Sequence, residues 1–336
     1  MAGGAGGGAG GGAGGGAGGG AGGGAGPPPD APRGAPEVLR GKAGARGWAR
    51  AARGRGERVA LVPTMGALHE GHLALVERAR ALADRVVVSV YLNPAQFAPG
   101  EDFGSYPQAA EADLAALARQ GACDAVFLPS EGLYEDGLEV EEGGPAGGGS
   151  GRELNQTWVT VERLQQGLCG GSRPTFFRGI ATTVCKLFNL LEPDVAVFGE
   201  KDWQQLAVIR RMARDLDFGV EVVGAPIVRE ADGLALSSRN LRLSAEDRAR
   251  APGVYAALRA ARARAQGGET RAAGRGGLVE ATAEGIEAAG GRVDYVECVD
   301  KTSLRSLQVL EDPADALLAV AASYGDVRLI DNISLG

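Results

Sequence analysis

The sequence predicts an α/β protein with a Rossmann-like parallel sheet, helices on both faces of that sheet, and a smaller C-terminal α/β domain. Short β-branched runs alternate with segments of helical periodicity as far as about residue 226. These runs are continuously apolar, as strands of a sheet covered on both faces are. After residue 226 the sequence pattern changes: Ala- and Arg-rich segments of helical periodicity are followed by further predicted strands.

The periodicity places each element in order. In the first part we expect strands at 59–62, 86–92, 125–128, 195–198 and 220–223, and helices at 72–84, 108–121, 179–192 and 202–217. Asp202 is expected to be the N-cap of the last of these helices. Before the first strand, an amphipathic helix within 33–58 is expected to turn Val38, Leu39, Trp48 and Ala52 to the core. In the second part we expect helices at 245–266 and 278–289 and strands near 292–299, 316–322 and 327–331.

Composition shifts divide the chain into a tail and two domains. Residues 1–26 repeat Ala-Gly-Gly-Gly and lack large apolar side chains, so a tail over residues 1–33 is predicted to be disordered. A nucleotide-binding domain is predicted for residues 34–226, with an acidic, Gly-rich surface insertion at 136–151, and a lid domain for residues 227–336. The G-x-G-x-x-G matches in the tail follow no strand and open no helix, which argues against a dinucleotide-dependent oxidoreductase.

Charge and cysteine usage narrow the function and the compartment. With 35 basic and 42 acidic residues the net charge is −7, so no basic excess is present to bind nucleic acid. No run of 18 apolar residues occurs, which predicts no membrane span. The four cysteines form no C-x-x-C pair and predict a reduced, cytoplasmic setting. The Arg-rich stretch at 33–58 leaves an organellar transit segment as an alternative, disfavoured because the stretch has no Ser.

The chain has two histidines, and both lie in the tetrapeptide from His69 to His72. This tetrapeptide follows a predicted strand and a turn and opens a predicted helix. A zinc site would need the pair four residues apart on the helix, whereas here they are three apart and separated by Gly71. A structural role for both remains open, but the amides of a helix N-terminus favour an anion there. Gly66 and Gly71 would let a phosphate approach the backbone, which predicts a nucleotide site without a Walker loop.

Three further polar clusters follow predicted strands or join the two domains. Lys201 stands between a buried strand and a helix, where its ammonium group can meet a phosphate, and Gln205 lies about one helical turn further on. The loop 236–240 offers two hydroxyls and a guanidinium, which suit the β- and γ-phosphates of a nucleotide. The segment 91–97 follows the end of another predicted strand. Because the carboxyl ends of parallel strands meet at one edge of a sheet, these three clusters and the histidine tetrapeptide predict one cleft.

With these motifs the sequence resembles the pantothenate synthetase (pantoate–β-alanine ligase) family, which belongs to the His-x-Gly-His nucleotidyltransferase superfamily. The resemblance covers roughly residues 36–333 and rests on the runs Leu61–His72, Asn93–Phe97, Phe177–Gly179, Gly199–Asp202 with Gln205, Leu236–Asn240 and Arg328–Asp331. Phe176, Gln108 and the insertion at 136–151 depart from many bacterial members and resemble the plant-type branch.

The resemblance implies ligation of (R)-pantoate with β-alanine through a pantoyl adenylate, with release of AMP and pyrophosphate. It implies that His72 is the catalytic acid and that His69 and Lys201 stabilise phosphate charge. It implies a pantoate site at Gln96 and Gln205, with Gln96 also beside β-alanine. The ATP site it implies consists of Pro63, Thr64, Met65, Gly66, His69, Gly71, His72, Gly199, Glu200, Lys201, Asp202, Val228, Leu236, Ser237, Ser238 and Arg239.

The resemblance also implies a Rossmann-like domain with a C-terminal lid domain, a homodimer, and Mg²⁺ that accompanies ATP. No metal-ligating residue is assigned, because these three departures make the transfer of a metal ligand around Glu111–Asp113 unsafe. Two alternatives stay open: another adenylyltransferase or aminoacyl-tRNA synthetase relative, and a catalytically inactive binding protein on the same fold. The lack of a basic surface weighs against the tRNA-dependent enzyme, and the intact His69, His72, Lys201 and Arg239 weigh against an inactive protein.

Overall fold

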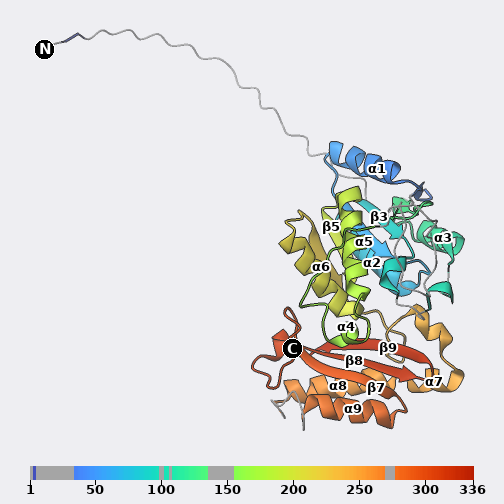
Figure 1. The fold of residues 1–336 in the computed structure, drawn as a ribbon, viewed down its shortest axis with the longest axis vertical. Coiled ribbons are helices and arrows are strands. Elements are labelled where there is room, and N and C mark those ends of the chain that lie inside the picture. Colours follow the sequence, from blue (N-terminus) through green and yellow to red (C-terminus); the bar gives the residue numbers. More distant parts are fainter. Residues whose placement is uncertain (1–2, 5–33, 98–101, 106–107, 135–154, 269–276) are drawn as a thin grey trace, which may run out of the picture. The chain divides into compact units, whose positions relative to one another are not determined.

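A six-stranded parallel sheet forms the larger part of the fold, and a three-stranded antiparallel sheet lies in the C-terminal part (Figure 1). The structure is a computed structural model that describes residues 3–4, 34–97, 102–105, 108–134, 155–268 and 277–336. Residues 33–336 belong to one compact unit. The mixed α/β class and the parallel sheet predicted from the sequence are confirmed.

The elements of the larger part are β1 (Glu37–Leu39), α1 (Lys42–Gly54), β2 (Val59–Thr64), α2 (Glu70–Arg80), β3 (Arg85–Val90), α3 (Ala110–Gln120), β4 (Ala125–Phe127), α4 (Leu168–Ser172), α5 (Phe176–Leu191), β5 (Val195–Gly199), α6 (Trp203–Asp215) and β6 (Glu221–Ala225). The C-terminal part comprises α7 (Ala245–Arg250), α8 (Gly253–Gln266), α9 (Leu278–Ala288), β7 (Arg292–Asp300), β8 (Ala316–Tyr324) and β9 (Val327–Ser334). Short 3-10 turns include η1 (Pro94–Gln96), η3 (Glu200–Asp202) and η4 (Ser238–Arg242).

The parallel sheet buries both of its faces, which explains the continuous apolar runs. Successive side chains of a strand point to opposite faces. Leu61 and Val87 therefore join a buried cluster with α1, α5 and α6, whereas Val62 and Val88 join a second cluster with α2 and α3. All four of these side chains are fully buried. Helices α1, α5 and α6 thus cover one face of the sheet, and α2 and α3 cover the other.

The strand order places a binding crevice beside β2. The order is β1-β4-β3-β2-β5-β6, so β2 pairs with β3 on one side and with β5 on the other, and the chain direction across the sheet reverses there. Loops that leave adjacent strands at such a reversal diverge to opposite faces and leave a crevice at the carboxyl ends. The polar clusters after β2, β3 and β5 all lie at that edge.

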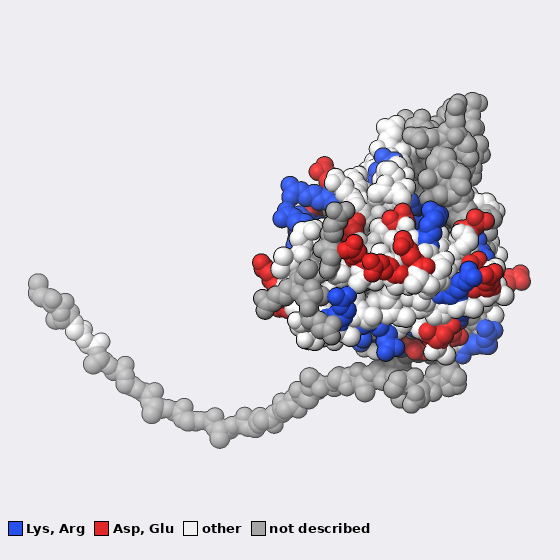
Figure 2. All heavy atoms as spheres, turned by 90° about the horizontal axis from the view of Figure 1, so that it is seen from below, with Lys and Arg blue, Asp and Glu red and all other residues white. Residues whose placement is uncertain are grey.

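The antiparallel sheet of the C-terminal part packs against two helices. Strand β8 is central and pairs with β7 and β9, and α8 and α9 cover one face of the sheet (Figure 1). Tyr324, Leu258 and Leu278 are among the fully buried side chains of this core. On the face shown in Figure 2, the basic and acidic side chains of the described residues are interspersed. None of the helices built from the described residues combines the length and apolarity that a membrane crossing requires.

Two local predictions are wrong, each for a physical reason. Val38 and Leu39 lie in strand β1, which pairs with β4, because a free strand edge there satisfies their backbone groups. The helix expected over 245–266 is two helices, α7 and α8, interrupted at Pro252, which has no N–H to donate within a helix. Asp202 is the N-cap residue of α6, as predicted, although its side chain makes no capping hydrogen bond.

Several predictions remain untested by the described residues. The insertion at 136–151 lies outside the described residues, as does almost all of the tail at 1–33. The division into domains at residues 226 and 227 stays a prediction, since residues 33–336 form one unit.

The close approach of α5 to the turn after β3 requires glycine at position 179. A Cβ built there would lie 2.2 Å from the Ala95 carbonyl oxygen and 2.9 Å from the Gln96 nitrogen, and neither backbone atom can yield easily. Gly179→Ala should therefore lower the free energy of unfolding by at least about 1–3 kcal/mol, measured by urea denaturation. Gly44→Ala is the matched control, because a Cβ in the exposed position 44 of α1 meets no atom within 4 Å. In the control, the free energy of unfolding should rise by about 0.5–1 kcal/mol, because Ala favours a helix interior more than Gly does. A Gly179→Ala protein as stable as the parent would contradict the packing argument.

Candidate active site

A cavity of about 200 Å³ with both polar and apolar walls opens at the carboxyl ends of the parallel strands. It is bounded by the end of β2, the loops that follow β2 and β3, the turn that precedes α6, the segment before α5, and the η4 turn of the C-terminal part. The predicted site residues that line it are Pro63, Thr64, Met65, His72, Gln96, Asp202, Gln205 and Arg239. The structure thus brings together residues from all four of the polar clusters seen in the sequence.

The loop between β2 and α2 is held by side chains at successive backbone amides. Thr64 Oγ1 accepts a hydrogen bond from Gly66 N (3.2 Å) and donates one to Ser89 O (2.8 Å). The buried Asp113 carboxylate accepts hydrogen bonds from Ala67 N (3.0 Å) and Leu68 N (2.7 Å). These bonds stabilise a loop in which Gly66 and Ala67 have positive φ values of 87° and 52°. A left-handed Ala is unfavourable by itself, so the Asp113 contacts compensate for local strain.

The two histidines cap the start of α2 reciprocally. His69 is the N-cap residue, and its Nδ1 accepts a hydrogen bond from Gly71 N (3.2 Å), while His72 Nδ1 accepts one from His69 N (3.3 Å). A neutral imidazole that accepts through Nδ1 carries its hydrogen on Nε2. Both rings therefore offer an Nε2–H donor, and their centroids are 4.1 Å apart.

This arrangement differs from the one the sequence suggested for the anion. The amides of the helix N-terminus were expected to favour an anion, with Gly66 and Gly71 letting a phosphate approach the backbone. In the structure the amides of Gly66, Ala67, Leu68, His69 and Gly71 are each bound by a side chain. Gly71 accommodates the His69 ring, because a Cβ at position 71 would lie 2.9 Å from His69 Cε1. The imidazole Nε2–H groups are thus side-chain donors available to an anion at this place.

Burial keeps both imidazoles neutral. Desolvation, followed by the charges of His69 and Lys201, lowers the pKa of His72 to about 3. Desolvation and then the Lys201 charge lower the pKa of His69 as well. Because both pKa values lie below the usual 6.5, the two rings are neutral hydrogen-bond donors at pH 7 in the absence of an anion.

Gln96 is oriented by a buried asparagine. Asn93 Nδ2 donates to Gln96 Oε1 (3.0 Å) and to Gly179 O (3.2 Å), and Asn93 Oδ1 accepts from Ala95 N (3.1 Å). With Oε1 occupied, the Gln96 amide turns its Nε2 toward the Met65 sulfur, which is a weak acceptor. Gln96 Nε2 is thus a donor that a carboxylate or hydroxyl oxygen in the cavity can take over from Met65.

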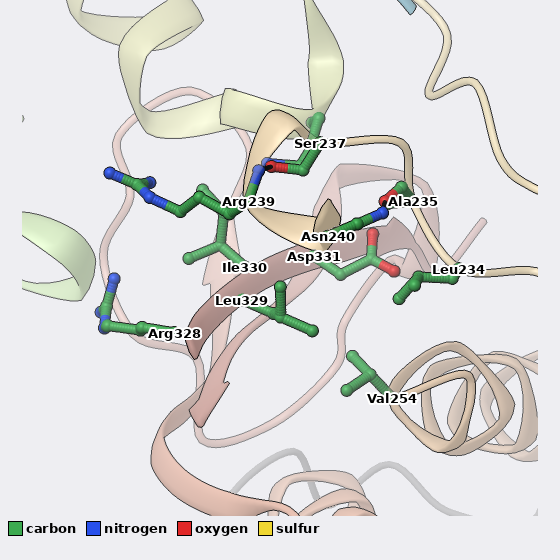
Figure 3. Close-up of a pocket in the computed structure, with 11 residues that line it drawn as sticks. Leu234, Ala235, Ser237, Arg239, Asn240, Val254, Arg328, Leu329, Ile330 and Asp331 are labelled. Carbon is green, nitrogen blue, oxygen red and sulfur yellow. Dashed lines mark hydrogen bonds between the residues drawn. The ribbon is translucent and has the colours of Figure 1, made fainter. Parts of the chain in front are cut away.

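Positively charged side chains line a smaller cavity that shares Arg239 with the first one. Lys201, Ser237, Arg239 and Arg328 line it, and Arg239 borders both cavities. Figure 3 shows the guanidinium groups of Arg239, from η4, and Arg328, from β9, projecting to the same side. Arg328 is paired with Asp294 through two hydrogen bonds of 2.9 and 2.6 Å. Three positive side chains beside two imidazole donors suit an extended anion such as a polyphosphate.

The other predicted site residues line neither of these two cavities. They are Gly66, His69, Gly71, Gly199, Glu200, Val228, Leu236 and Ser238. Some of them shape the site through neighbours: the His69 ring lies against His72, and Leu236 N donates to Val228 O (3.0 Å). The Glu200 carboxylate lies against Gly224 of β6, where an added Cβ would be 2.9 Å from its Oε1, and this packing turns it toward β6.

Sequence reasoning missed several residues that build the site. Arg173 lines the larger cavity, lies 3.6 Å from the Phe176 ring centroid and donates to Gln96 O (3.1 Å). Ser89 also lines it, and among the described residues its buried Oγ has no hydrogen-bond partner. Asp113 lies in the first turn of α3, distant in sequence from the loop it holds. An Arg before a helix and an Asp at a helix start are common surface patterns, so the sequence alone gave no signal for either.

No group of three or more His, Cys, Asp or Glu side chains that could hold a metal ion occurs among the residues the structure describes. The donor set of the larger cavity is instead amide, imidazole, hydroxyl and guanidinium, with Asp202 as its acidic member. These groups recognise carboxylates, hydroxyls and phosphates, whereas Mg²⁺ prefers carboxylate and water oxygens.

The fold and the cavity first define a class: an α/β protein whose small-molecule site lies at a strand-order reversal of a parallel sheet. The family model described as pantoate-beta-alanine ligase matches residues 37–334. The chain belongs to the pantoate–β-alanine ligase family, and it is an enzyme of this type.

Individual relatives agree over almost the full chain. The pantoate–beta-alanine ligase of Arabidopsis thaliana is 47% identical over 309 residues, which cover 89% of this chain and 98% of the relative. The crystal structure of pantothenate synthetase from Thermus thermophilus superposes with a TM-score of 0.75 at 42% identity, covering 89% of this chain and 99% of that one. The Francisella tularensis ligase, complexed with beta-gamma ATP and beta-alanine, has a TM-score of 0.70 at 27% identity and covers 90% and 98% of the two chains.

The neutral state of His72 can be measured directly, because the chain has two histidines. In the ligand-free protein, nitrogen-15 NMR should show the His72 ring as the neutral Nε2–H tautomer from about pH 5 to about pH 8. The physical reason is desolvation at the start of α2. A His72→Gln variant assigns the remaining signals to His69. A His72 ring that titrates near pH 6.5 would contradict the burial argument.

Proposed function

We propose that the enzyme condenses (R)-pantoate with β-alanine in two steps through a pantoyl adenylate. In the first step a pantoate carboxylate oxygen bonds to the α-phosphorus of ATP, the bond from that phosphorus to the bridging oxygen breaks, and pyrophosphate leaves. In the second step the β-alanine amine bonds to the acyl carbon, AMP leaves with the former carboxylate oxygen, and the amine loses a proton. The products are pantothenate, AMP and pyrophosphate.

The pair of Nε2–H donors on His69 and His72 carries this proposal. An in-line displacement at phosphorus builds negative charge on the oxygens around the reacting centre, so catalysis consists mainly of positioning and charge stabilisation. Two neutral imidazoles, fixed through Nδ1, give this stabilisation without reorganising. Lys201 adds a positive charge close enough to lower both imidazole pKa values. We therefore assign His72 as a neutral hydrogen-bond donor, where the family resemblance suggested an acid.

The proposed nucleotide site follows the cavities from β2 to η4. The α-phosphate would lie at His69, His72 and Lys201, and the β- and γ-phosphates at Ser237, Ser238 and Arg239. The remaining members are Pro63, Thr64, Met65, Gly66, Gly71, Gly199, Glu200, Asp202, Val228 and Leu236. For Glu200 we assign the main chain, because its carboxylate packs against Gly224. The similar Francisella tularensis ligase, which is complexed with beta-gamma ATP and beta-alanine, supports ATP as a substrate here.

Pantoate is assigned to the larger cavity, because Gln96 and Gln205 both line its wall. The oriented Nε2 of Gln96 suits a pantoate carboxylate or hydroxyl oxygen, and the same side chain lies beside the proposed β-alanine site. The apolar part of this wall includes Ile180, Val184 and Leu187, which suit the geminal methyl groups of pantoate.

Mg²⁺ enters the proposal as the counterion of ATP. Since the described residues provide no group of three metal-ligating side chains, we assign the ion to the phosphate oxygens. When bound there, it would neutralise charge on the departing pyrophosphate.

A cytoplasmic location, a homodimer and a lid-like C-terminal domain from residue 227 complete the proposal. The location is supported by α1, which takes up much of the Arg-rich stretch considered as a transit segment and buries Ala45, Ala49 and Ala52 in the core. The homodimer rests on the family resemblance, and sedimentation at several concentrations would test it.

Exchange of radiolabel between pyrophosphate and ATP, with pantoate present and β-alanine left out, tests the first step. The parent should exchange only when pantoate is present. His72→Asn keeps an acceptor close to the position of Nδ1 but lacks the Nε2–H donor, and should slow exchange by a factor of about 10²–10³. His72→Gln retains an amide N–H near the Nε2 position and is the matched control, which should lose less.

Other outcomes would contradict parts of this account. An Asn variant as fast as the parent would remove His72 from the catalytic step. A Gln variant as slow as the Asn variant would argue for an imidazolium acid in place of a neutral donor. Absence of exchange in the parent, even with β-alanine added and AMP release followed, would favour the inactive-homologue alternative.

A further inference from the structure

Asn332, near the end of β9, forms hydrogen bonds to the backbone of η3, the turn in the larger part of the fold that carries Lys201. This turn is called the lysine turn below. Its side-chain Nδ2 donates hydrogen bonds of 2.9 Å to both Glu200 O and Lys201 O, the first two carbonyls of η3. Asn332 is only 6% exposed, so these bonds are shielded from water and costly to lose. One buried amide therefore fixes two successive peptide groups of the turn that carries Lys201.

The backbone of Asn332 is itself held in place by a rigid charged group. Asn332 N donates to Asp331 Oδ1 (2.8 Å), and the Asp331 carboxylate is bound by Arg229 through hydrogen bonds of 2.6 and 2.9 Å. The Arg229 guanidinium lies 3.6 Å from the Tyr255 ring centroid. Because the Arg229 guanidinium and the Asp331 carboxylate are little exposed and joined by two parallel hydrogen bonds, the orientation of the carboxylate is fixed as well as its distance from Arg229. The amide of Asn332 thus extends from a fixed base.

The turn has a second bond to the C-terminal part, from its other side. Trp203 Nε1 donates to Lys301 O (2.9 Å), just after the η3 turn and just beyond β7. Lys201 lies within this attached segment, and its side chain lines the cavity that contains Arg239. The backbone of Lys201 is therefore fixed by the C-terminal part as well as by β5.

We propose that Asn332 is a positioning residue for Lys201, holding the lysine turn so that the ammonium group stays at the phosphate site. It acts through the carbonyls of Glu200 and Lys201. The inference rests on the proposed function, because it assigns Lys201 to phosphate charge. It goes beyond that function by making a residue of the C-terminal sheet a requirement for catalysis on the parallel sheet. Losing it should displace Lys201 and affect the catalysed rate more than ground-state binding.

A double-mutant cycle with Lys201 tests the proposal. Four full-length proteins are compared in pantoate-dependent ATP–pyrophosphate exchange: the parent, Asn332→Ala, Lys201→Ala and the double variant. Asn332→Ala should lower kcat by a factor of about 10–100, with a smaller change in the KM for ATP, because small displacements of a charged group are costly to the rate. In the Lys201→Ala background the same change should cost less than about twofold, since nothing remains to be positioned.

Two further variants separate positioning from stability. Thr282→Val removes a buried hydroxyl that donates to Leu278 O (2.7 Å) within α9, and so disturbs the C-terminal part without touching the turn. It should lower the unfolding temperature while the exchange rate stays within about twofold of the parent. Asn332→Asp keeps the side-chain size but places an acceptor opposite two carbonyls, and should lose at least as much activity as Asn332→Ala. It serves as the test variant should Asn332→Ala fail to fold.

The outcomes separate this inference from the proposed function. Equal fold-losses from Asn332→Ala in both backgrounds would overturn the positioning role, as would an Asn332 variant with parental kcat. A parent that does not exchange at all would instead overturn the proposed function. Both the positioning role and the proposed function are supported if the parent exchanges and Asn332→Ala slows exchange only in the protein that retains Lys201.

Discussion

The site depends on the buried Asp113 carboxylate that accepts the amides of Ala67 and Leu68. Without it, two amides of the loop after β2 would lack a partner, and nothing would offset the left-handed conformation of Ala67. The conformation of this loop determines where α2 begins and makes His69 its N-cap. The orientation of both imidazoles therefore follows from a carboxylate that lies in a different helix.

This constraint explains why the site uses side-chain donors at the start of α2. Thr64, Asp113 and the two histidines accept hydrogen bonds from the loop amides. Since Nδ1 of each imidazole is used in this way, Nε2–H of each ring is the donor that an anion can bind. Neutral donors of fixed direction stabilise developing charge without a reorganisation cost. In the proposed chemistry Lys201 and Arg239 supply the full charges; Lys201 lies in η3, directly after β5, and Arg239 lies in η4 of the C-terminal part. That chemistry thus requires that the two parts of the fold keep a defined relation.

The sequence predicted what local patterns determine. Continuous apolar runs identified the buried parallel strands, and polar residues after strands identified Gln96, Lys201 and Gln205, because strand ends meet at one edge of a sheet. The sequence did not predict β1, since three residues are too few to show a period and their pairing with β4 is a tertiary event. Asp113, Arg173 and Asn332 were missed for a similar reason. Each acts on a backbone group far away in the chain, and no spacing rule reports such a contact.

The central claim is that a pantoate oxygen attacks the α-phosphorus of ATP. Turnover of pantoate labelled with oxygen-18 in its carboxylate, with mass analysis of the nucleotide and pyrophosphate products, tests it most directly. The account predicts one labelled oxygen in AMP and none in pyrophosphate, because the acyl–oxygen bond breaks in the second step. Label in inorganic phosphate, with ADP as the nucleotide product, would show attack at the γ-phosphorus and would contradict the account.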